Sequence, residues 1–202
     1  MKEKENFDIS HIFYELLKMV FLVLMVSVCT LAIIKYIWQT IMIEGDSMLP
    51  TFADTNEILI SKLGDKSAYD RYDIIVFKPY DKDIPETEED ETEILYIKRI
   101  VGLPGETIRV TDRGEVMVSK DGSTFSVLED DPFSGGSFIR GINWNLNDNN
   151  YYESVTLGAD EYFVLGDNRQ ISLDSRSEHV RAVNISCIIG KYMFKIHPFG
   201  KN

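Results

Sequence analysis

Cysteine and histidine are scarce in this chain, and their scarcity excludes several kinds of site. The 202 residues include two cysteines and three histidines, with no CxxC pair and no cluster of these residue types. A zinc site is therefore not supported, and no metal or cofactor is expected. Cys29 lies inside a long apolar stretch, so we do not expect it to form a disulfide bond with Cys187.

Basic charge is also in short supply. Lysine and arginine total 21 against 33 aspartates and glutamates, which gives a formal net charge of −12 and a pI near 4.7. A nucleic-acid-binding domain normally presents a basic face, and anionic lipid attracts basic segments. The balance therefore argues against a nucleic-acid partner and against docking on lipid through charge. Hydrophobic residues make up 44% of the chain, so a folded core is expected.

One long uncharged run lies near the N-terminus. Residues 19–34 carry no charge, Lys18 and Lys35 bracket them, and tyrosine and tryptophan lie at the edges. With its apolar flanks the run is long enough for a bilayer core, and the lysines can extend toward the headgroups. We predict a permanent transmembrane anchor over residues 19–38. A cleaved signal peptide is one alternative, although no small-x-small site follows the run, and a buried core helix is another.

The basic residues also predict an orientation. Lys2, Lys4 and Lys18 precede the run, so the positive-inside rule places a short tail, residues 1–18, in the cytoplasm. We therefore expect a single-pass protein of the cell membrane with an extracytoplasmic domain over residues 39–202.

After the anchor, short alternating or β-branched runs are separated by Gly, Asp, Asn and Pro, which predicts a mostly β domain. The expected strands cover residues 41–44, 57–62, 73–78, 94–101, 107–111, 115–118, 161–165 and 187–196. The acidic stretch 79–93 lacks apolar periodicity and is expected to be a solvated loop. Residues 121–150, rich in Gly, Ser, Asn and Asp, are expected to form an irregular insertion.

Ser47, in the stretch IEGDSMLPT, raises a chemical question. A free serine is a poor nucleophile and needs a nearby base. His11 precedes the anchor, His197 lies in a C-terminal IHPFG, and His179 lies among charges in SRSEHVR, where a solvated surface histidine is the preferred interpretation. Lysine is the other option, provided that burial lowers its pKa enough to leave the amine neutral.

Lys98 is the lysine that fits this requirement. It lies in ILYIKRIVGLPGE, and on a strand it would share a face with Tyr96 and Ile100. That apolar setting would desolvate the amine. An edge-strand lysine that prevents aggregation is the alternative, and Lys98 alone does not decide between the two. The LPGE at the end of the run predicts a turn that reverses the strand.

Four blocks follow the anchor in order: GDSMLPT (45–51), RYDIIVF (71–77), YIKRIVGLPGE (96–106) and GDNRQISLDSR (166–176). Together they closely resemble type I signal peptidases, the Ser/Lys leader peptidases of peptidase family S26, in the short single-span form of Gram-positive bacteria. The resemblance implies an antiparallel β catalytic domain, signal-peptidase or LexA-like, after one transmembrane helix. It also implies a serine endopeptidase that cleaves N-terminal signal peptides from exported preproteins after small-x-small sites.

The resemblance assigns a role to each motif residue. Ser47 matches the nucleophile and Lys98 the general base. Ser172 matches the hydroxyl that hydrogen-bonds and orients the lysine. Asp174 and Arg176 match the charged pair that supports the site.

Further matches concern the shape of the site. Asp167, Asn168 and Arg169 match the loop beside the catalytic residues. Some relatives carry a serine where this chain has Gly45, so a backbone group or water must replace that donor to the oxyanion. Met48 either contributes to the apolar surface near the site or is a core residue.

The chain departs from the family pattern at two places. Tyr72 replaces the usual glycine of the second block, and residues 177–180 lack the aromatic and glycine that usually follow the last block. Three alternatives stay open: a peptidase with a dedicated substrate such as a pilin-type surface protein, a soluble self-cleaving repressor with a Ser/Lys pair, and a membrane-tethered assembly protein without activity. The expected partners are preprotein signal peptides and the lipid bilayer.

Overall fold

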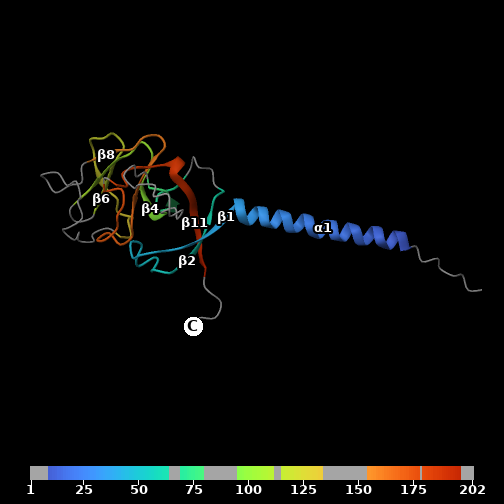
Figure 1. Cartoon of the computed structure of the whole chain (residues 1–202). Helices are drawn as coiled ribbons and strands as arrows, with labels where there is room; N and C mark the ends of the chain where they lie inside the picture. The colour runs from blue at the N-terminus through green and yellow to red at the C-terminus, as the bar shows by residue number, and fades with distance from the viewer. Residues whose placement is uncertain are drawn as a thin grey trace, which may run out of the picture.

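The architecture is one long helix followed by a β domain, as seen in a computed structural model of the chain. The structure describes residues 9–63, 69–79, 95–111, 115–133, 154–177 and 179–196. Helix α1 projects away from the β domain, as Figure 1 shows. The acidic stretch predicted to be a solvated loop falls almost entirely outside the described residues, as do residues 134–150 of the predicted insertion and His197.

Helix α1 (Ile9–Tyr36) has 28 residues, which at about 1.5 Å per residue gives roughly 42 Å. Its most apolar 18-residue window has a mean hydropathy of 2.6, and none of that window is buried against the rest of the protein. A buried core helix, one of the alternatives above, is therefore excluded. The helix already includes Ile9, ahead of the expected residue 19, and the residues directly before Met19, Glu15 to Lys18, are good helix formers that continue it.

The helix passes into the sheet through a single residue. Ile37 lies between α1 and the first strand, its N–H donates to Ile33 O at 2.9 Å, and its carbonyl accepts from Lys62 N at 2.7 Å. Trp38, expected to end the anchor, is instead the first residue of strand β1. The connection is therefore hydrogen-bonded on both sides.

The main sheet has seven strands in the order β1-β2-β11-β3-β4-β9-β10, and every neighbouring pair is antiparallel. These strands are β1 (Trp38–Met42), β2 (Glu57–Ser61), β11 (Ile188–Ile196), β3 (Ile74–Phe77), β4 (Tyr96–Gly102), β9 (Glu161–Leu165) and β10 (Val183–Asn184). A short 3-10 helix, Ile185–Cys187, precedes β11. The mostly antiparallel β fold predicted from the sequence is confirmed.

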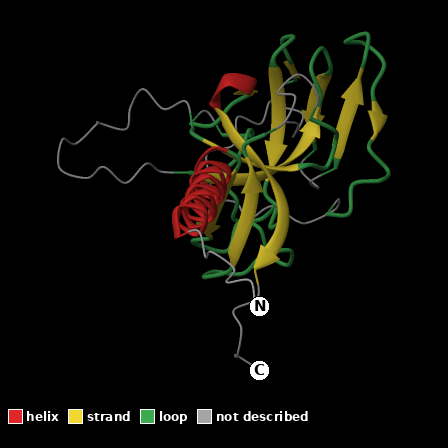
Figure 2. Ribbon diagram, turned by 90° about the vertical axis from the view of Figure 1, so that its right-hand side faces the viewer, coloured by secondary structure: helices red, strands yellow, loops and turns green. Residues whose placement is uncertain are grey.

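A smaller sheet has the order β7-β6-β5-β8, also antiparallel. Its strands are β5 (Thr107–Val110), β6 (Val116–Ser119), β7 (Ser126–Val127) and β8 (Val155–Thr156). Figure 1 shows the strands at one end of α1, and Figure 2, which looks nearly along the helix, shows them fanned out around it. All eight expected strands are present. Strands β7, β8 and β10 were missed because two residues are too few to show an alternating pattern.

Strand β4 lies in the interior of the main sheet, between β3 and β9. Lys98 pairs with Ile75 of β3, and Arg99 pairs with Leu165 of β9. Lys98 is therefore not an edge-strand residue, and that alternative is wrong. At the end of β4, Glu106 N donates to Leu103 O at 3.1 Å, which confirms the predicted turn.

Apolar side chains cover both faces of the sheet around β3. Ile75 and Phe77 belong to a cluster with Tyr162 and Val164, while Ile74 and Val76 belong to a different cluster. All four residues of β3 are buried, which explains why its sequence is an unbroken apolar run. The two cysteines are both free, as expected.

We predict that Ile75→Ala lowers the free energy of unfolding by about 2–5 kcal/mol, because the side chain is fully buried beside β4. The measurement is urea unfolding of the full chain in detergent. Val127→Ala is the matched control, since Val127 is 43% exposed and its loss should change the free energy of unfolding by less than about 0.5 kcal/mol. Equal effects from both substitutions would contradict the packing described for β3.

Candidate active site

The structure brings Ser47 and Lys98 together although 51 positions separate them. Lys98 Nζ lies 2.9 Å from Ser47 Oγ and donates a hydrogen bond to Ile97 O at the same distance. Ser47 belongs to the loop between β1 and β2, and Lys98 to the middle of β4. The bond to Ile97 O occupies one N–H of the amine and so helps to fix which way the nitrogen points.

Lys98 is only 4% exposed, which confirms the apolar setting expected from its neighbours. Burial lowers the pKa of Lys98 from its ordinary value to about 8, although the charges of Asp174 and Asp167 act to raise it. The aromatic ring of Tyr96 lies on the same side, with its centroid 5.4 Å from Nζ. A minor fraction of the amine is therefore neutral near physiological pH and able to accept a proton, and this fraction is far larger than for an exposed lysine.

The backbone around Ser47 is held open. Gly45 has a φ of 84°, a left-handed conformation that favours glycine, and a Cβ there would meet no atom within 4 Å. The N–H of Gly45 is already used, since it donates to Asp54 Oδ1 at 2.8 Å. In contrast, no residue that the structure describes accepts a hydrogen bond from the N–H of Ser47.

The loop after β9 packs directly on the Ser47 loop. Asn168 N donates to Ser47 O at 3.0 Å, and Asn168 Nδ2 donates to Asp46 O at 3.1 Å. Gly166, at the start of this loop, leaves no room for a side chain: a Cβ there would overlap Ser172 and lie 2.6 Å from Ser47 O. Glycine at position 166 is therefore required for the close approach of the two loops.

Ser172 is fully buried beside Gly166. Its hydroxyl has no hydrogen-bond partner among the described residues, so the expected bond to Lys98 is not present in this geometry. Lys98 donates to Ile97 O instead. A buried hydroxyl without a partner is costly, and a hydrogen bond formed during the reaction would remove that cost.

Two buried ion pairs flank these residues. Asp174 accepts from Arg176 Nε at 2.8 Å and Nη2 at 2.9 Å, and it also accepts from Gly166 N at 3.0 Å. Asp167 accepts from Arg99 Nε at 2.8 Å and Nη2 at 2.6 Å. Charge-assisted pairs of this kind fix the planes of the groups as well as their separation.

Sequence reasoning missed two members of this network. These are Arg99, which forms an ion pair with Asp167, and Thr51, which donates to Asp167. A charged residue within a central apolar strand was an available signal for Arg99. Met48 is fully buried in a core cluster, so it is a core residue, and His179 is exposed.

Comparison with known proteins identifies the family of this chain. A family model described as signal peptidase, peptidase S26, matches residues 14–197. The chain belongs to this family. It is therefore a serine endopeptidase, a hydrolase of peptide bonds, and a peptidase that cleaves signal peptides.

Curated relatives include Gram-positive enzymes, as the resemblance implied. Signal peptidase I of Bacillus caldolyticus is 32% identical over 180 residues, covering 86% of this chain and 88% of the relative. Signal peptidase I of Streptococcus pneumoniae serotype 4 is 31% identical over 191 residues, covering 81% and 84%. Among solved structures, a signal peptidase I from Enterococcus faecalis aligns with a TM-score of 0.39 at 26% identity, covering 61% of this chain and 96% of that one.

Gly166→Ala is expected to lower peptidase activity at least tenfold, because the added methyl must displace Ser172 or the Ser47 backbone. The measurement is the cleavage rate of a preprotein by the folded variant. Gly158→Ala is the control, since a Cβ there would approach only the flexible end of the Glu161 side chain. Wild-type activity in Gly166→Ala would contradict the tight packing between the two loops.

Proposed function

We propose that this protein is a membrane-anchored signal peptidase that cleaves preproteins after small-x-small sites, with Ser47 as nucleophile and Lys98 as general base. The observation that carries the proposal is the 2.9 Å separation of Ser47 Oγ from the Nζ of a lysine that is 4% exposed. A neutral lysine is a competent base only if it is desolvated and within hydrogen-bond reach, and Lys98 meets both conditions.

In the first half of the reaction, the neutral amine of Lys98 accepts the hydroxyl proton of Ser47 while Oγ attacks the scissile carbonyl carbon. The carbon–nitrogen bond of the peptide then breaks, and the proton passes from Lys98 to the leaving amine of the mature protein. In the second half, Lys98 accepts a proton from water, which attacks the ester. Ser47 Oγ recovers that proton as the signal peptide is released as a carboxylic acid, which then loses its own proton to the solvent.

The oxyanion of each tetrahedral intermediate needs donors that are not already occupied. We assign this role to the backbone N–H of Ser47, which makes no hydrogen bond to the described part of the chain. The Gly45 N–H is excluded because Asp54 accepts from it. A second donor in the form of water fits beside Gly45, where nothing lies within 4 Å of the side-chain position.

Ser172, Asp174, Arg176 and Asp167 are assigned to support of the site. The buried hydroxyl of Ser172 is available to hydrogen-bond the amine of Lys98 as it changes charge. Asp174 accepts a hydrogen bond from Gly166 N and forms an ion pair with Arg176. The pair therefore fixes the position of Gly166, where the loop that contacts Ser47 begins. Asp167 joins the same loop to the strand that carries Lys98, through Arg99.

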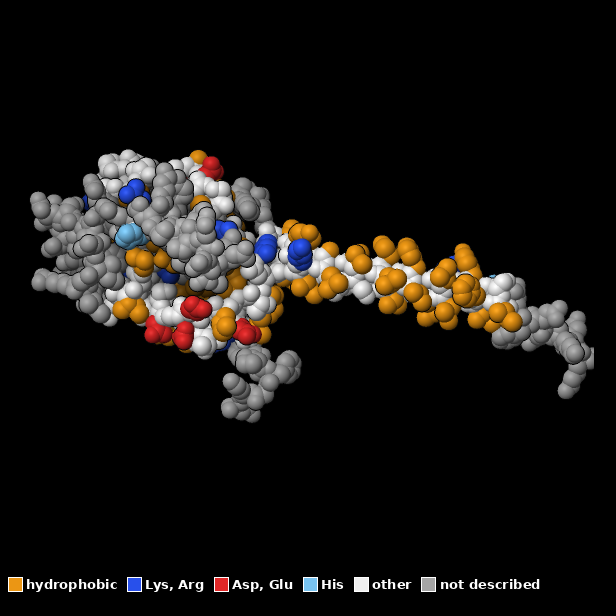
Figure 3. Space-filling view, viewed as in Figure 1, with side chains coloured by type: hydrophobic (Ala, Val, Ile, Leu, Met, Phe, Trp, Pro, Cys, Tyr) orange, Lys and Arg blue, Asp and Glu red, His pale blue; other side chains and the backbone are white. Residues whose placement is uncertain are grey.

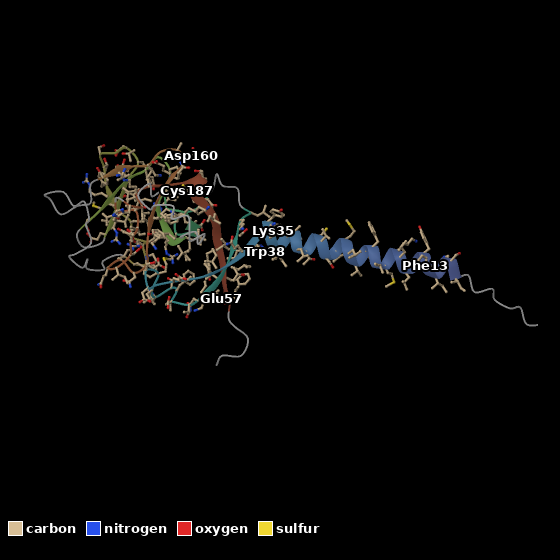
Figure 4. All side chains as sticks on the ribbon, viewed as in Figure 1. Phe13, Lys35, Trp38, Glu57, Asp160 and Cys187 are labelled. Carbon is tan, nitrogen blue, oxygen red and sulfur yellow. The ribbon has the colours of Figure 1, made fainter. Side chains whose placement is uncertain are left out.

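Helix α1 supports the membrane part of the proposal. Hydrophobic side chains cover it along its length (Figure 3), and the family match includes most of it. Lys35 and Trp38 lie where it meets the β domain, and Phe13 lies near the other end (Figure 4). Lysine and tryptophan suit the interface between lipid and water. We place the N-terminus in the cytoplasm and the β domain outside, with the signal peptides of exported preproteins as substrates.

The packing beside Ser47 supports a preference for small substrate residues. Met48, which follows Ser47 in the chain, and Phe52 are buried in one apolar cluster with Ile43, so the segment that carries the nucleophile is closely packed. A large side chain before the scissile bond would have to displace them, whereas alanine would not. Cleavage of a panel of preproteins distinguishes a general signal peptidase from one with a dedicated substrate.

We predict that Ser47→Ala and Lys98→Ala each reduce cleavage of a preprotein by about 10³-fold or more, and that the double variant is no worse than either. The non-additivity follows because the two residues act as one unit. The measurement is release of the mature protein in detergent or lipid vesicles. Ser126→Ala and Lys120→Ala, which change exposed residues of the small-sheet region, are the controls. A Lys98→Ala variant that retains most of the activity would sink the assignment of the base.

The rate of the chemical step should rise with pH and level off above about pH 8. The sign follows from the lowered pKa of Lys98, because the protonated amine that predominates below about 8 cannot accept the proton of Ser47. Single-turnover rates measured from about pH 6 to about pH 10 test this expectation. A profile that stays flat down to the acidic end would rule out a lysine base.

A further inference from the structure

Asp131 lies outside all four sequence motifs, yet it forms a buried bidentate ion pair with a motif residue. Arg169 Nη1 donates to Asp131 Oδ2 at 2.8 Å, and Arg169 Nη2 donates to Asp131 Oδ1 at 2.7 Å. Arg169 is 3% exposed and Asp131 is 5% exposed. A guanidinium so deeply buried depends on its partner, since removing one member of a buried pair leaves an uncompensated charge.

The remaining contacts of Arg169 lead to the nucleophile. Arg169 Nε donates to Gly166 O at 3.0 Å, and Arg169 O accepts from Arg176 Nη2 at 2.9 Å. Gly166 is the residue at which a Cβ would overlap Ser172 and lie 2.6 Å from Ser47 O. Direct contacts therefore run from Asp131 through Arg169 and Gly166 to the backbone of Ser47.

Asp131 lies in the loop that follows β7 of the small sheet and is not part of the sheet that carries Lys98. We call residues 128–133 the brace segment. Its first residue follows β7, and Leu128 N donates to Val116 O of β6 at 2.8 Å. At its other end, the ring of Phe133 lies 5.4 Å from Arg99 Cζ, a cation–π distance. The brace segment thus contacts two arginines. Asp131 binds Arg169, which lies in the loop after β9, and Phe133 contacts Arg99, which binds Asp167 of that loop.

Tyr72 adds to the same region. It replaces the family glycine and adopts a left-handed φ of 73°. Its carbonyl accepts from Arg99 Nη1 at 2.9 Å. Its hydroxyl is buried, and the charge of Asp131 contributes, after burial, to raising its pKa. The departure from the family pattern therefore lies close enough to Asp131 to feel its charge, and it binds Arg99 through its carbonyl.

We propose that Asp131 is a positioning residue for the peptidase: through Arg169 it fixes the loop over residues 166–172 against Ser47. This inference rests on the proposed function, because it concerns the geometry of the same nucleophile. Without the carboxylate, the charged guanidinium would turn toward water and release Gly166 O. The loop that holds Ser47 through Asn168 would then lose its support, while the surface that binds substrate would stay in place.

The test compares Asp131→Asn with Asp130→Asn in the full chain. Asp130 is an exposed carboxylate next to Asp131 in sequence, so it matches the change in charge without touching Arg169. Active sites are counted with a serine-acylating probe, and cleavage of a preprotein is followed in single turnovers. We expect Asp131→Asn to lower kcat per active site about 10- to 100-fold with KM changed less than about twofold, because misplacement of reacting groups affects the chemical step. Asp130→Asn should behave like wild type.

A second variant separates positioning from stability. Asp131→Leu combined with Arg169→Met removes both charges, which is often neutral or stabilising for a buried pair, and also removes the bond to Gly166 O. We expect near wild-type urea unfolding but a persistently low kcat. Wild-type kcat in the double variant, or equal kcat in Asp131→Asn and Asp130→Asn, would overturn the positioning role. So would loss of folding in both Asp131 variants, which would assign the pair to stability.

The two proposals fail in different ways. If wild type and Ser47→Ala cleave the preprotein alike, the proposed function fails whatever the Asp131 variants do. If Ser47→Ala is inactive while Asp131→Asn equals wild type, only the positioning role fails.

Discussion

The desolvated amine of Lys98 is the constraint on which the rest of the site depends. Its pKa falls to about 8 because burial outweighs the two carboxylates nearby, Asp174 and Asp167. Those carboxylates are each bound by an arginine, Arg176 and Arg99, so much of their charge is already compensated. If either aspartate lacked its arginine, its charge would favour the ammonium form of Lys98 more strongly. The ion pairs therefore serve the neutrality of the lysine as well as the shape of the loop.

A desolvated lysine next to a paired arginine requires a strand in the interior of a sheet. The two faces of that strand must have different surroundings. In β4, Lys98 pairs with an apolar residue of β3, while Arg99 points to the opposite side and reaches Asp167. One strand thus carries the proposed base, Lys98, and the arginine that anchors the neighbouring loop at adjacent positions. A shift of register by one residue would exchange the two, which is why the buried apolar run of β3 matters to the chemistry.

Many features of the fold and of the candidate site could be predicted from the sequence, because they depend on residues that are adjacent in the chain. The apolar run of α1, the alternation in the strands and the apolar neighbours of Lys98 are all properties of adjacent residues. The pairing of Asp131 with Arg169 could not be predicted in this way. The two residues are 38 positions apart, and the sequence around either one does not indicate its partner. Strands of two residues, such as β7 and β10, were missed for a related reason: they exist only because a longer neighbour offers them hydrogen bonds.

The junction between α1 and the main sheet fixes the distance between the helix and the candidate active site. Ile37 is the only residue between α1 and β1, and both of its backbone groups are hydrogen-bonded. For the membrane-anchored enzyme proposed above, this connection has no slack, so the fold sets the distance of Ser47 from the lipid and no flexible linker can change it. The substrate must then bring its scissile bond to that distance. The enzyme would then select a peptide bond by its distance from the end of the apolar segment of the substrate that remains in the lipid.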